Sequence, residues 1–339
     1  MLFSVIMPVY NVYNYLENAV LSIISQNNSD WELILIDDGS TDGSESLCDN
    51  FANEDSRIIS VHQENQGSGA ARQKGIDMAK GDYLVFVDPD DYISEDALSN
   101  YSLVIKKYRI DVLVNGFYTI LKNKNTQGII RKTVPQISGY FDKNEFIKVY
   151  PKYSKKVHKA LWNKVYKRSF IVNNDIRFSG SPIGEDWEFN INVYKYLTNI
   201  FISKEAYYFY DTRREGSAVR KYRTDRMKLE VKLAEKHKNL FNLWNIYDEN
   251  KKTYYLDLYG GIVVEINNLM LSNKYSSLRD KATILRSNIN SFSDKDMFLY
   301  LNSSDFDSFK EKLQFQLLKY KLYYLIFLFL KINKVKKKI

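Results

Sequence analysis

The first hundred residues alternate between short apolar runs and stretches with apolar residues at helical spacing. Continuous apolar runs are typical of parallel strands that are covered on both faces. The strands predicted in this way are Phe3 to Val9, Trp31 to Ile36, Arg57 to His62 and Tyr83 to Val87, and the helices between them are 12–25, 42–51 and 69–79. This order predicts an α/β fold with a parallel, doubly wound sheet and right-handed crossovers.

The pattern changes after about residue 111. We expect two strands, 112–121 and 128–134, joined by a polar turn, then helices at 143–150 and 188–197 and a strand at 200–210. Further along, the chain is predicted to be almost entirely helical, with helices at 225–247, 253–272, 278–290 and 305–332. We therefore expect an α/β domain over residues 1–220 and a helical C-terminal region over residues 221–339.

Composition is that of a globular protein, because 45% of the 339 residues are hydrophobic and 27% are charged. The chain is long enough for two domains. Its single cysteine, Cys48, excludes an internal disulfide framework, fits a reducing compartment, and is expected to be a packed, inert thiol. No secretion signal is visible before the first predicted strand, so we expect a cytoplasmic protein.

The net charge of +8 is concentrated near the C-terminus. The lysines concerned are Lys319, Lys321, Lys331, Lys334, Lys336, Lys337 and Lys338. They flank an apolar run from Leu322 to Leu330, which is too short to span a bilayer because a spanning helix needs about 20 residues. Such a segment favours a helix lying on an anionic membrane surface. The alternative is a helix packed on the domain, or a homodimer formed through the C-terminal helices.

Three carboxylates, Asp88, Asp90 and Asp91, directly follow the fourth predicted strand. Open α/β sheets bind their ligands at the carboxyl ends of strands. Carboxylates in a D-x-D arrangement suit Mg²⁺ or Mn²⁺, held by a few protein oxygens and by substrate phosphates. Asp91 has the alternative of capping the next segment.

The ends of the earlier strands offer what a sugar nucleotide needs. Pro8 and Tyr10 can place backbone groups and an aromatic ring beside a nucleobase, and Asp38 can accept the imide proton of a uracil ring. Residues 65–72 form a Gly-rich loop that opens a helix and can approach a nucleotide closely.

Other known sequence motifs are excluded by the elements around them. Arg72 stands where a dinucleotide-binding loop needs Gly or Ala, and that loop also follows the third strand instead of the first. Residues 38–49 resemble a calcium-binding EF-hand loop only in part, because a strand precedes them and Asp49 closes the loop where Glu is needed. The three histidines, His62, His158 and His237, are scattered and are expected to be ordinary surface or core residues.

Residues 5–11, 37–44, 65–75 and 81–91 together resemble a family 2 glycosyltransferase with the GT-A fold. The resemblance is dense over the first hundred residues, looser to about residue 220, and absent from the helical C-terminal region. It implies nucleotide-sugar contacts at Pro8, Tyr10, Asp38 and Arg72, and a D-x-D at Asp88 and Asp90 that binds Mn²⁺ or Mg²⁺. Asp90 is then the direct metal ligand, and Asp88 contacts ribose or metal.

The resemblance also implies a catalytic base near the start of a later helix. Gly184-Glu185-Asp186-Trp187 matches that pattern, so Asp186 is the candidate base and Glu185 its neighbour near the acceptor. The alternative is that both acids only favour a helix N-terminus. Trp162 is a candidate acceptor contact. Arg213 and Arg214 are candidates for binding the diphosphate, although Asp211 stands where many family members have Arg.

The implied reaction is an inverting, hexosyltransferase-type transfer from a nucleotide-diphosphate donor, expected to be a UDP-sugar. The expected acceptor is a lipid-linked glycan of bacterial capsular or exopolysaccharide synthesis, at the cytoplasmic side of the inner membrane. One alternative is a protein acceptor. The other is a non-catalytic protein that binds membranes or nucleic acid, but nucleic-acid binding is not expected because acidic residues gather at the strand ends.

Overall fold

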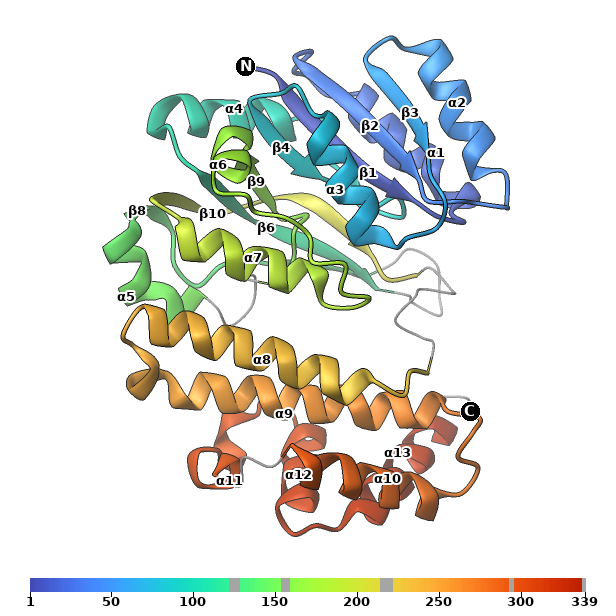
Figure 1. Cartoon of the computed structure of the whole chain (residues 1–339), viewed down its shortest axis with the longest axis vertical. Coiled ribbons are helices and arrows are strands. Elements are labelled where there is room, and N and C mark those ends of the chain that lie inside the picture. The colour runs from blue at the N-terminus through green and yellow to red at the C-terminus, as the bar shows by residue number, and fades with distance from the viewer. Residues whose placement is uncertain (122–128, 154–158, 214–221, 293–295, 337–339) are drawn as a thin grey trace. The chain divides into compact units, whose positions relative to one another are not determined.

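The structure is a computed structural model of the chain that describes residues 1–121, 129–153, 159–213, 222–292 and 296–336 (Figure 1). The chain divides into two compact units, Met1–Glu215 and Gly216–Ile339. The predicted domain boundary at residue 220 lies outside the described residues.

A mixed sheet forms the centre of the first unit. Its strands are β1 (Phe3–Val9), β2 (Trp31–Asp37), β3 (Ile58–His62), β4 (Tyr83–Phe86), β5 (Tyr92–Ile93), β6 (Val112–Leu121), β7 (Ile129–Thr133), β8 (Gly139–Asp142), β9 (Lys164–Lys167) and β10 (Asn199–Asp211). The order is β3-β2-β1-β4-β9-β6-β10-β5, with β7 paired to β6 and β8 paired to β10. β1 runs parallel to both β2 and β4, and β2 runs parallel to β3. The predicted parallel, doubly wound sheet is therefore confirmed for these four strands.

Helices cover both faces of this sheet. They are α1 (Tyr13–Ile24), α2 (Ser44–Glu54), α3 (Ser68–Met78), α4 (Ala97–Tyr108), α5 (Lys143–Tyr153), α6 (Arg168–Asn173) and α7 (Glu185–Tyr196). Alternate side chains of β1, among them Val5 and Met7, share a buried core with α1, α2 and α4. The opposite face of the sheet carries Ile6, which packs against α3 at Gly75, and Phe86, which packs against Phe189 of α7. Figure 1 shows α3 and α7 together in front of the sheet.

Several predicted elements differ from the structure. The helix expected to begin at Asp42 begins at Ser44, and Gly43 takes the capping position in a left-handed conformation. β9 was not predicted, and it inserts between β4 and β6, antiparallel to both. Its four residues are too few to show a strand period, and two of them are lysines. The pairing of β6 with β7 confirms the predicted hairpin, and its turn lies outside the described residues.

The second unit is helical, as predicted. Its elements are α8 (Arg226–Leu243), α9 (Tyr247–Leu271), α10 (Leu278–Ser291), α11 (Met297–Tyr300), a 3₁₀ turn (Ser303–Asp305), α12 (Phe309–Lys319) and α13 (Tyr323–Lys336). The single helix expected at 305–332 is two helices, because the chain breaks at Lys321, which has a positive φ of 57°. The sequence shows no Gly or Pro at this break, so pattern alone could not place it.

The apolar run on α13 packs within the second unit. Tyr323, Ile326 and Phe327 are buried in a core that also contains residues of α9, α10 and α12. The opposite side of the helix keeps Tyr324 and Leu325 about two-fifths exposed, at 43% and 41%. One face of this helix therefore packs on its own domain, which was the alternative to a membrane-surface helix, and the membrane contact stays a prediction for the other face. Among the described residues, no helix is long and apolar enough to cross a membrane.

Candidate active site

The parallel register brings the carboxyl ends of three strands to one edge of the sheet. Val9 of β1 lies opposite Asp37 of β2, and Ile6 of β1 lies opposite Phe86 of β4. The residues just after these strands therefore become neighbours, as the sequence predicted. Tyr10 is 47% exposed at this edge, whereas Pro8 is buried within β1.

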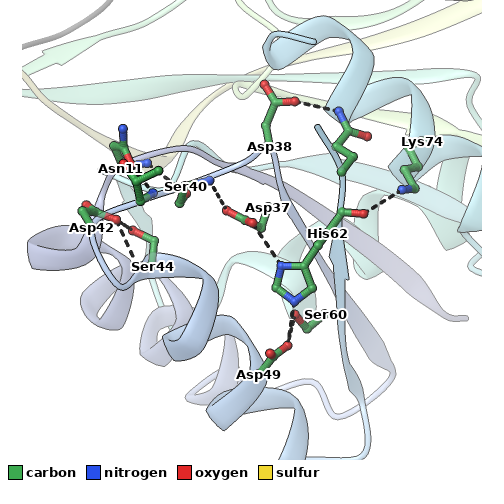
Figure 2. A network of polar contacts seen from close by, with 12 residues as sticks. Asn11, Asp37, Asp38, Ser40, Asp42, Ser44, Asp49, Ser60, His62 and Lys74 are labelled. Carbon is green, nitrogen blue, oxygen red and sulfur yellow. Dashed lines mark hydrogen bonds and ion pairs between the residues drawn. The ribbon is translucent and has the colours of Figure 1, made fainter. Parts of the chain in front are cut away.

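The Asp38 carboxylate holds the Gly-rich loop in place through hydrogen bonds. Asp38 (Figure 2) is 3% exposed. Its carboxylate accepts hydrogen bonds from the Gln63 side chain and from the backbone N–H groups of Gln66 and Gly67, each at 2.8 Å. Gly67 has a φ of 91° and directly precedes α3. The carboxylate that was predicted to bind a nucleobase thus also fixes the turn that opens this helix.

Arg72 is the centre of a cluster of carboxylates. It lies on α3, is 5% exposed, and donates to Asp88 at 2.8 Å, to Asp186 at 3.0 Å and to Glu185 at 3.1 Å. Ser68, one turn earlier on α3, also donates to Glu185, at 2.7 Å. The acidic pair at the start of α7 is therefore joined to the D-x-D after β4. The described partners of Arg72 are carboxylates, and its contact with a nucleotide stays a prediction.

The environment of Asp186 is suited to a proton acceptor. Burial raises the pKa of Asp186 to about 7. The Arg72 guanidinium acts to lower this pKa, whereas the negative charges of Glu185 and Asp88 act to raise it. Its side chain is nevertheless 27% exposed, so it remains accessible. Lys164 of β9 is 1% exposed nearby, and burial lowers its pKa well below the usual range. The sequence did not single out Lys164, because a lysine on a short strand normally faces solvent.

Asp91 joins the acidic turn to β10 instead of capping the next segment. It is 1% exposed and accepts from the Tyr208 hydroxyl at 2.7 Å and from the backbone N–H of Asp211 at 2.8 Å. Burial, together with the charges of Asp88 and Asp90, raises the pKa of Asp91 to about 9. The Tyr208 hydroxyl in turn accepts from the Asp88 N–H at 3.1 Å, which fixes the backbone of the D-x-D.

An aromatic stack lies beside this turn. Trp162 stacks on Tyr208 with ring centroids 4.5 Å apart and on Tyr210 at 5.5 Å. Tyr210 is 39% exposed, so part of the stack faces solvent. The structure thus brings Trp162, predicted to contact the acceptor, next to the carboxylates through Tyr208. Stacked rings of this kind suit the apolar face of a sugar.

Of the two candidate diphosphate residues, the structure describes Arg213, whose carboxylate partner is Asp211 and not a member of the Arg72 cluster. Arg213 is exposed, and its guanidinium binds both oxygens of Asp211, at 2.8 Å and 2.9 Å from Nε. Arg214 lies outside the described residues.

The chemistry of the site fits a divalent cation. Three carboxylates, from Asp88, Glu185 and Asp186, lie around one guanidinium, so negative charge is in excess and would repel a diphosphate. Within the described part of the chain, no three His, Cys, Asp or Glu side chains form a ready metal cage. Asp88 and Asp90 therefore fit a Mg²⁺ or Mn²⁺ ion that takes one or two protein carboxylates and completes its shell with substrate oxygens.

Comparison with known sequences agrees with this geometry. Residues 4–171 match the family model described as Glycosyl transferase family 2. The chain is 31% identical over 217 residues to Glycosyltransferase GlyA of Streptococcus pneumoniae serotype 4, covering 62% of this chain and 30% of the relative. It is 29% identical over 223 residues to the uncharacterized glycosyltransferase EpsJ of Bacillus subtilis, covering 62% and 60%. The chain thus spans less than two thirds of the length of these curated relatives.

Solved structures show the same fold. The crystal structure of S. aureus TarS 1-349 is 18% identical, with a TM-score of 0.64, and the match covers 98% of this chain and 92% of that one. The same TarS fragment in complex with UDP-GlcNAc matches with a TM-score of 0.63 at 20% identity. The mixed sheet with a helical C-terminal region is therefore the GT-A arrangement of TarS.

Removing the Arg72 guanidinium should destabilise the first unit. We expect Arg72→Met to lower the free energy of unfolding by about 2 kcal/mol or more, because three partly buried carboxylates lose their shared partner. Arg72→Lys should lower the free energy of unfolding by a smaller amount, because a lysine ammonium lacks the planar guanidinium that binds several carboxylates at once. The measurement is urea unfolding at pH 7.

Arg177→Met is the matched control. Arg177 is 57% exposed and pairs with Asp175 and Asp77, so its loss should leave the urea midpoint close to that of the wild type. Equal effects of the two Arg→Met changes would show that Arg72 does not hold the cluster together.

Proposed function

Because the chain belongs to glycosyl transferase family 2, we propose that it transfers a sugar from a UDP-sugar to an acceptor hydroxyl with inversion at the anomeric carbon. The observation that carries this proposal is the Arg72 cluster. It places a candidate base, Asp186, in the same hydrogen-bonded group as the strand-end carboxylate Asp88. Donor-binding and proton-accepting groups are then close enough to act on the two sides of one sugar.

Asp186 is the general base of this proposal. It removes the proton of the acceptor hydroxyl as that oxygen attacks the anomeric carbon and the bond to the donor phosphate breaks. A carboxylate with a pKa near neutrality is matched to this task, because it is ionised at working pH and still basic enough to hold the proton. Arg72 and Glu185 orient it, while the stacked Trp162 lies where an acceptor ring can rest.

Asp88 and Asp90 would hold a divalent cation in this proposal, and such an ion would supply positive charge beside the diphosphate of the leaving UDP. The excess of carboxylates supports the assignment, because it leaves the site short of positive charge for a diphosphate. Tyr10 and Asp38, at the ends of β1 and β2, flank the nucleobase. TarS, which shares this fold, has been crystallised with UDP and with UDP-GlcNAc, which favours a uridine donor.

The proposed acceptor is a bacterial surface polymer on a lipid carrier. Support for a polymer acceptor comes from a relative, the poly(ribitol-phosphate) beta-N-acetylglucosaminyltransferase TarS of Staphylococcus aureus, which is 26% identical over 220 residues. A polymer of this kind presents hydroxyl groups of the type that Asp186 would deprotonate.

We further propose that the exposed side of α13 rests on an anionic membrane. Tyr324 and Leu325 are exposed there, and Lys321 and Lys331 are exposed at the two ends of the same run. Apolar side chains flanked by lysines suit the boundary between acyl chains and anionic headgroups. A lipid-linked acceptor would then lie in the same plane as the enzyme.

Metal dependence is the first test. EDTA should abolish transfer, and Mn²⁺ or Mg²⁺ should restore it. Asp90→Asn should lower turnover a hundredfold or more, a change on the order of 3 kcal/mol in activation free energy. Asp77→Asn is the control, because Asp77 is an exposed carboxylate on α3 and should leave turnover unchanged. Full activity in EDTA would exclude the metal.

Replacing the base should affect chemistry more than binding. We expect Asp186→Asn to lower kcat by roughly 10²–10⁴-fold while the Kd for UDP stays within about threefold. Asp38→Ala should instead weaken UDP binding, because Asp38 holds the loop at Gln66 and Gly67. Calorimetry measures the Kd for UDP, and initial rates measure kcat, so the two measurements distinguish loss of binding from loss of chemistry. Wild-type turnover in Asp186→Asn would move the search for the base to Glu185.

The pH profile gives a second readout of Asp186. The base acts when deprotonated, and its pKa is raised to about 7, so kcat/KM for the acceptor should rise with pH through about 7 and then level off. This rising limb should be absent in Asp186→Asn. A profile that is flat from pH 5.5 to 8.5 in the wild type would contradict the assignment.

Membrane binding is tested by flotation with liposomes. Tyr324→Ser combined with Leu325→Ser should reduce binding to anionic vesicles at low salt, because it removes exposed apolar side chains and leaves the buried Ile326 and Phe327 in place. Leu299→Ser, at a leucine that is 80% exposed on α11, is the control and should not change binding. If the wild type stays in solution with anionic liposomes, the membrane proposal is wrong. Light scattering then tests a homodimer.

A further inference from the structure

His62 lies between two carboxylates at the end of β3. Its Nδ1 is 3.0 Å from Asp37 Oδ2, and its Nε2 is 2.9 Å from Asp49 Oδ1 of α2 (Figure 2). An ionised carboxylate only accepts hydrogen bonds, so both ring nitrogens must carry a proton for both contacts to form. Only the imidazolium form does so. The geometry therefore selects a charged histidine, which the scattered positions of these residues in the sequence did not reveal.

Asp37 depends on this contact because it is buried. Its side chain is 4% exposed, and its second oxygen accepts the backbone N–H of Ser40 at 3.1 Å. Without the imidazolium, a buried charge would lose its cationic partner where water has little access. Asp49 is 54% exposed and can be hydrated instead. The inner contact, between His62 and Asp37, is therefore the one with structural consequences.

The hydrogen bonds continue from Asp37 to the loop after β1. Ser40 Oγ accepts the N–H of Asn11 at 3.1 Å, and Asn11 Oδ1 accepts the N–H of Thr41 at 2.8 Å (Figure 2). Asn11 has a positive φ of 49°, a conformation that a non-glycine residue adopts only with support from its surroundings. Tyr10 directly precedes Asn11, and Asp38 directly follows Asp37. The two predicted nucleobase contacts thus sit on the two strand ends that this network ties together.

We infer that His62, as an imidazolium, is a positioning residue for the nucleobase end of the donor site, acting through Asp37, Ser40 and Asn11. This inference rests on the proposed UDP-sugar function. His62 itself need not touch the nucleotide. Its role is to keep the loop of residues 38–43 and the end of β1 in the arrangement that presents Tyr10 and Asp38.

Donor binding should then depend on pH. The hydrogen bonds to Asp37 and Asp49 raise the pKa of His62 above its usual value near 6.5. Lys74 donates from its ammonium to the His62 carbonyl. Cys48 of α2 lies near the same carboxylates and near Glu45, and burial raises the pKa of the Cys48 thiol to about 12, so it stays neutral. A raised pKa means that the contribution is complete below pH 6.5 and is lost as pH rises through the folded pKa.

The test measures the Kd for UDP by calorimetry between pH 6 and 9.5 at fixed Mg²⁺. We expect His62→Gln to raise the Kd about three- to twentyfold near neutral pH, as for loss of a charge-assisted hydrogen bond, and to leave kcat within about twofold. The affinity of the wild type for UDP should fall relative to that of His62→Gln as pH rises, so that the Kd values of the two proteins converge. Comparing them at each pH cancels the ionisation of UDP itself.

Two further variants separate positioning from general destabilisation. Asp49→Asn removes only the outer charge, so the pH at which wild-type affinity declines should shift downward. Ser60→Ala removes a hydroxyl that donates to the same Asp49 oxygen at 2.8 Å without touching the His62–Asp37 pair, and it should change neither Kd nor its pH dependence. Equal effects of His62→Gln and Ser60→Ala would overturn the inference.

Amide hydrogen exchange of residues 38–43 in the nucleotide-free enzyme supplies a readout that does not need UDP. Exchange there should be faster in His62→Gln than in the wild type at the same pH, and unchanged in Ser60→Ala. Unchanged exchange together with unchanged Kd would refute the positioning role. If the wild type fails to bind UDP at all, the proposed donor is wrong, and the exchange rates alone decide whether His62 holds the loop.

Discussion

The guanidinium of Arg72 holds together parts of the chain that are more than a hundred positions apart. Arg72 and Glu185 are separated by 113 positions, and Arg72 and Asp88 by only 16, yet all three meet within hydrogen-bonding distance. An isolated buried charge is strongly destabilising, so this arginine can stay buried only where several carboxylates surround it. The planar fork of the side chain allows it to bind more than one of them at once. Arg72 therefore ties the start of α7 to the D-x-D, in addition to the packing of Phe189 of α7 on Phe86 of β4.

The same cluster explains why the site is ready for charged ligands. One guanidinium does not neutralise the carboxylates around it, and the protein accommodates the excess by raising the pKa of Asp186 and Asp91 through burial. The two acids have different surroundings. Asp91 is fixed by Tyr208 and by the backbone of Asp211, whereas Asp186 keeps a quarter of its side chain exposed, at 27%. A buried acid with fixed partners, such as Asp91, suits a structural role. An accessible acid with a pKa near neutrality, such as Asp186, suits proton transfer.

Much of this site could be predicted from the sequence, since parallel strands align their carboxyl ends. Asp38 and Asp88 follow apolar runs, so both had to lie at the same edge of the sheet. Their partners could not be predicted in the same way. Asp38 is bound by backbone N–H groups, which every residue carries, and His62 meets Asp37 and Asp49 from 25 and 13 positions away. The carboxylate partners of Arg72 could not be predicted either, because motif spacing shows which residues recur and not which atoms they contact.

Two charge clusters therefore hold the two ends of the proposed donor site, and α3 connects them. Asp38 fixes the N–H of Gly67, the residue just before α3, and Arg72 lies about one turn into that helix. Ser68, the first residue of α3, binds Glu185 directly. The same short helix thus follows the turn that Asp38 fixes and carries the arginine that contacts Asp186. Groups at the two ends of the proposed donor site, far apart in the sequence, therefore share one structural support.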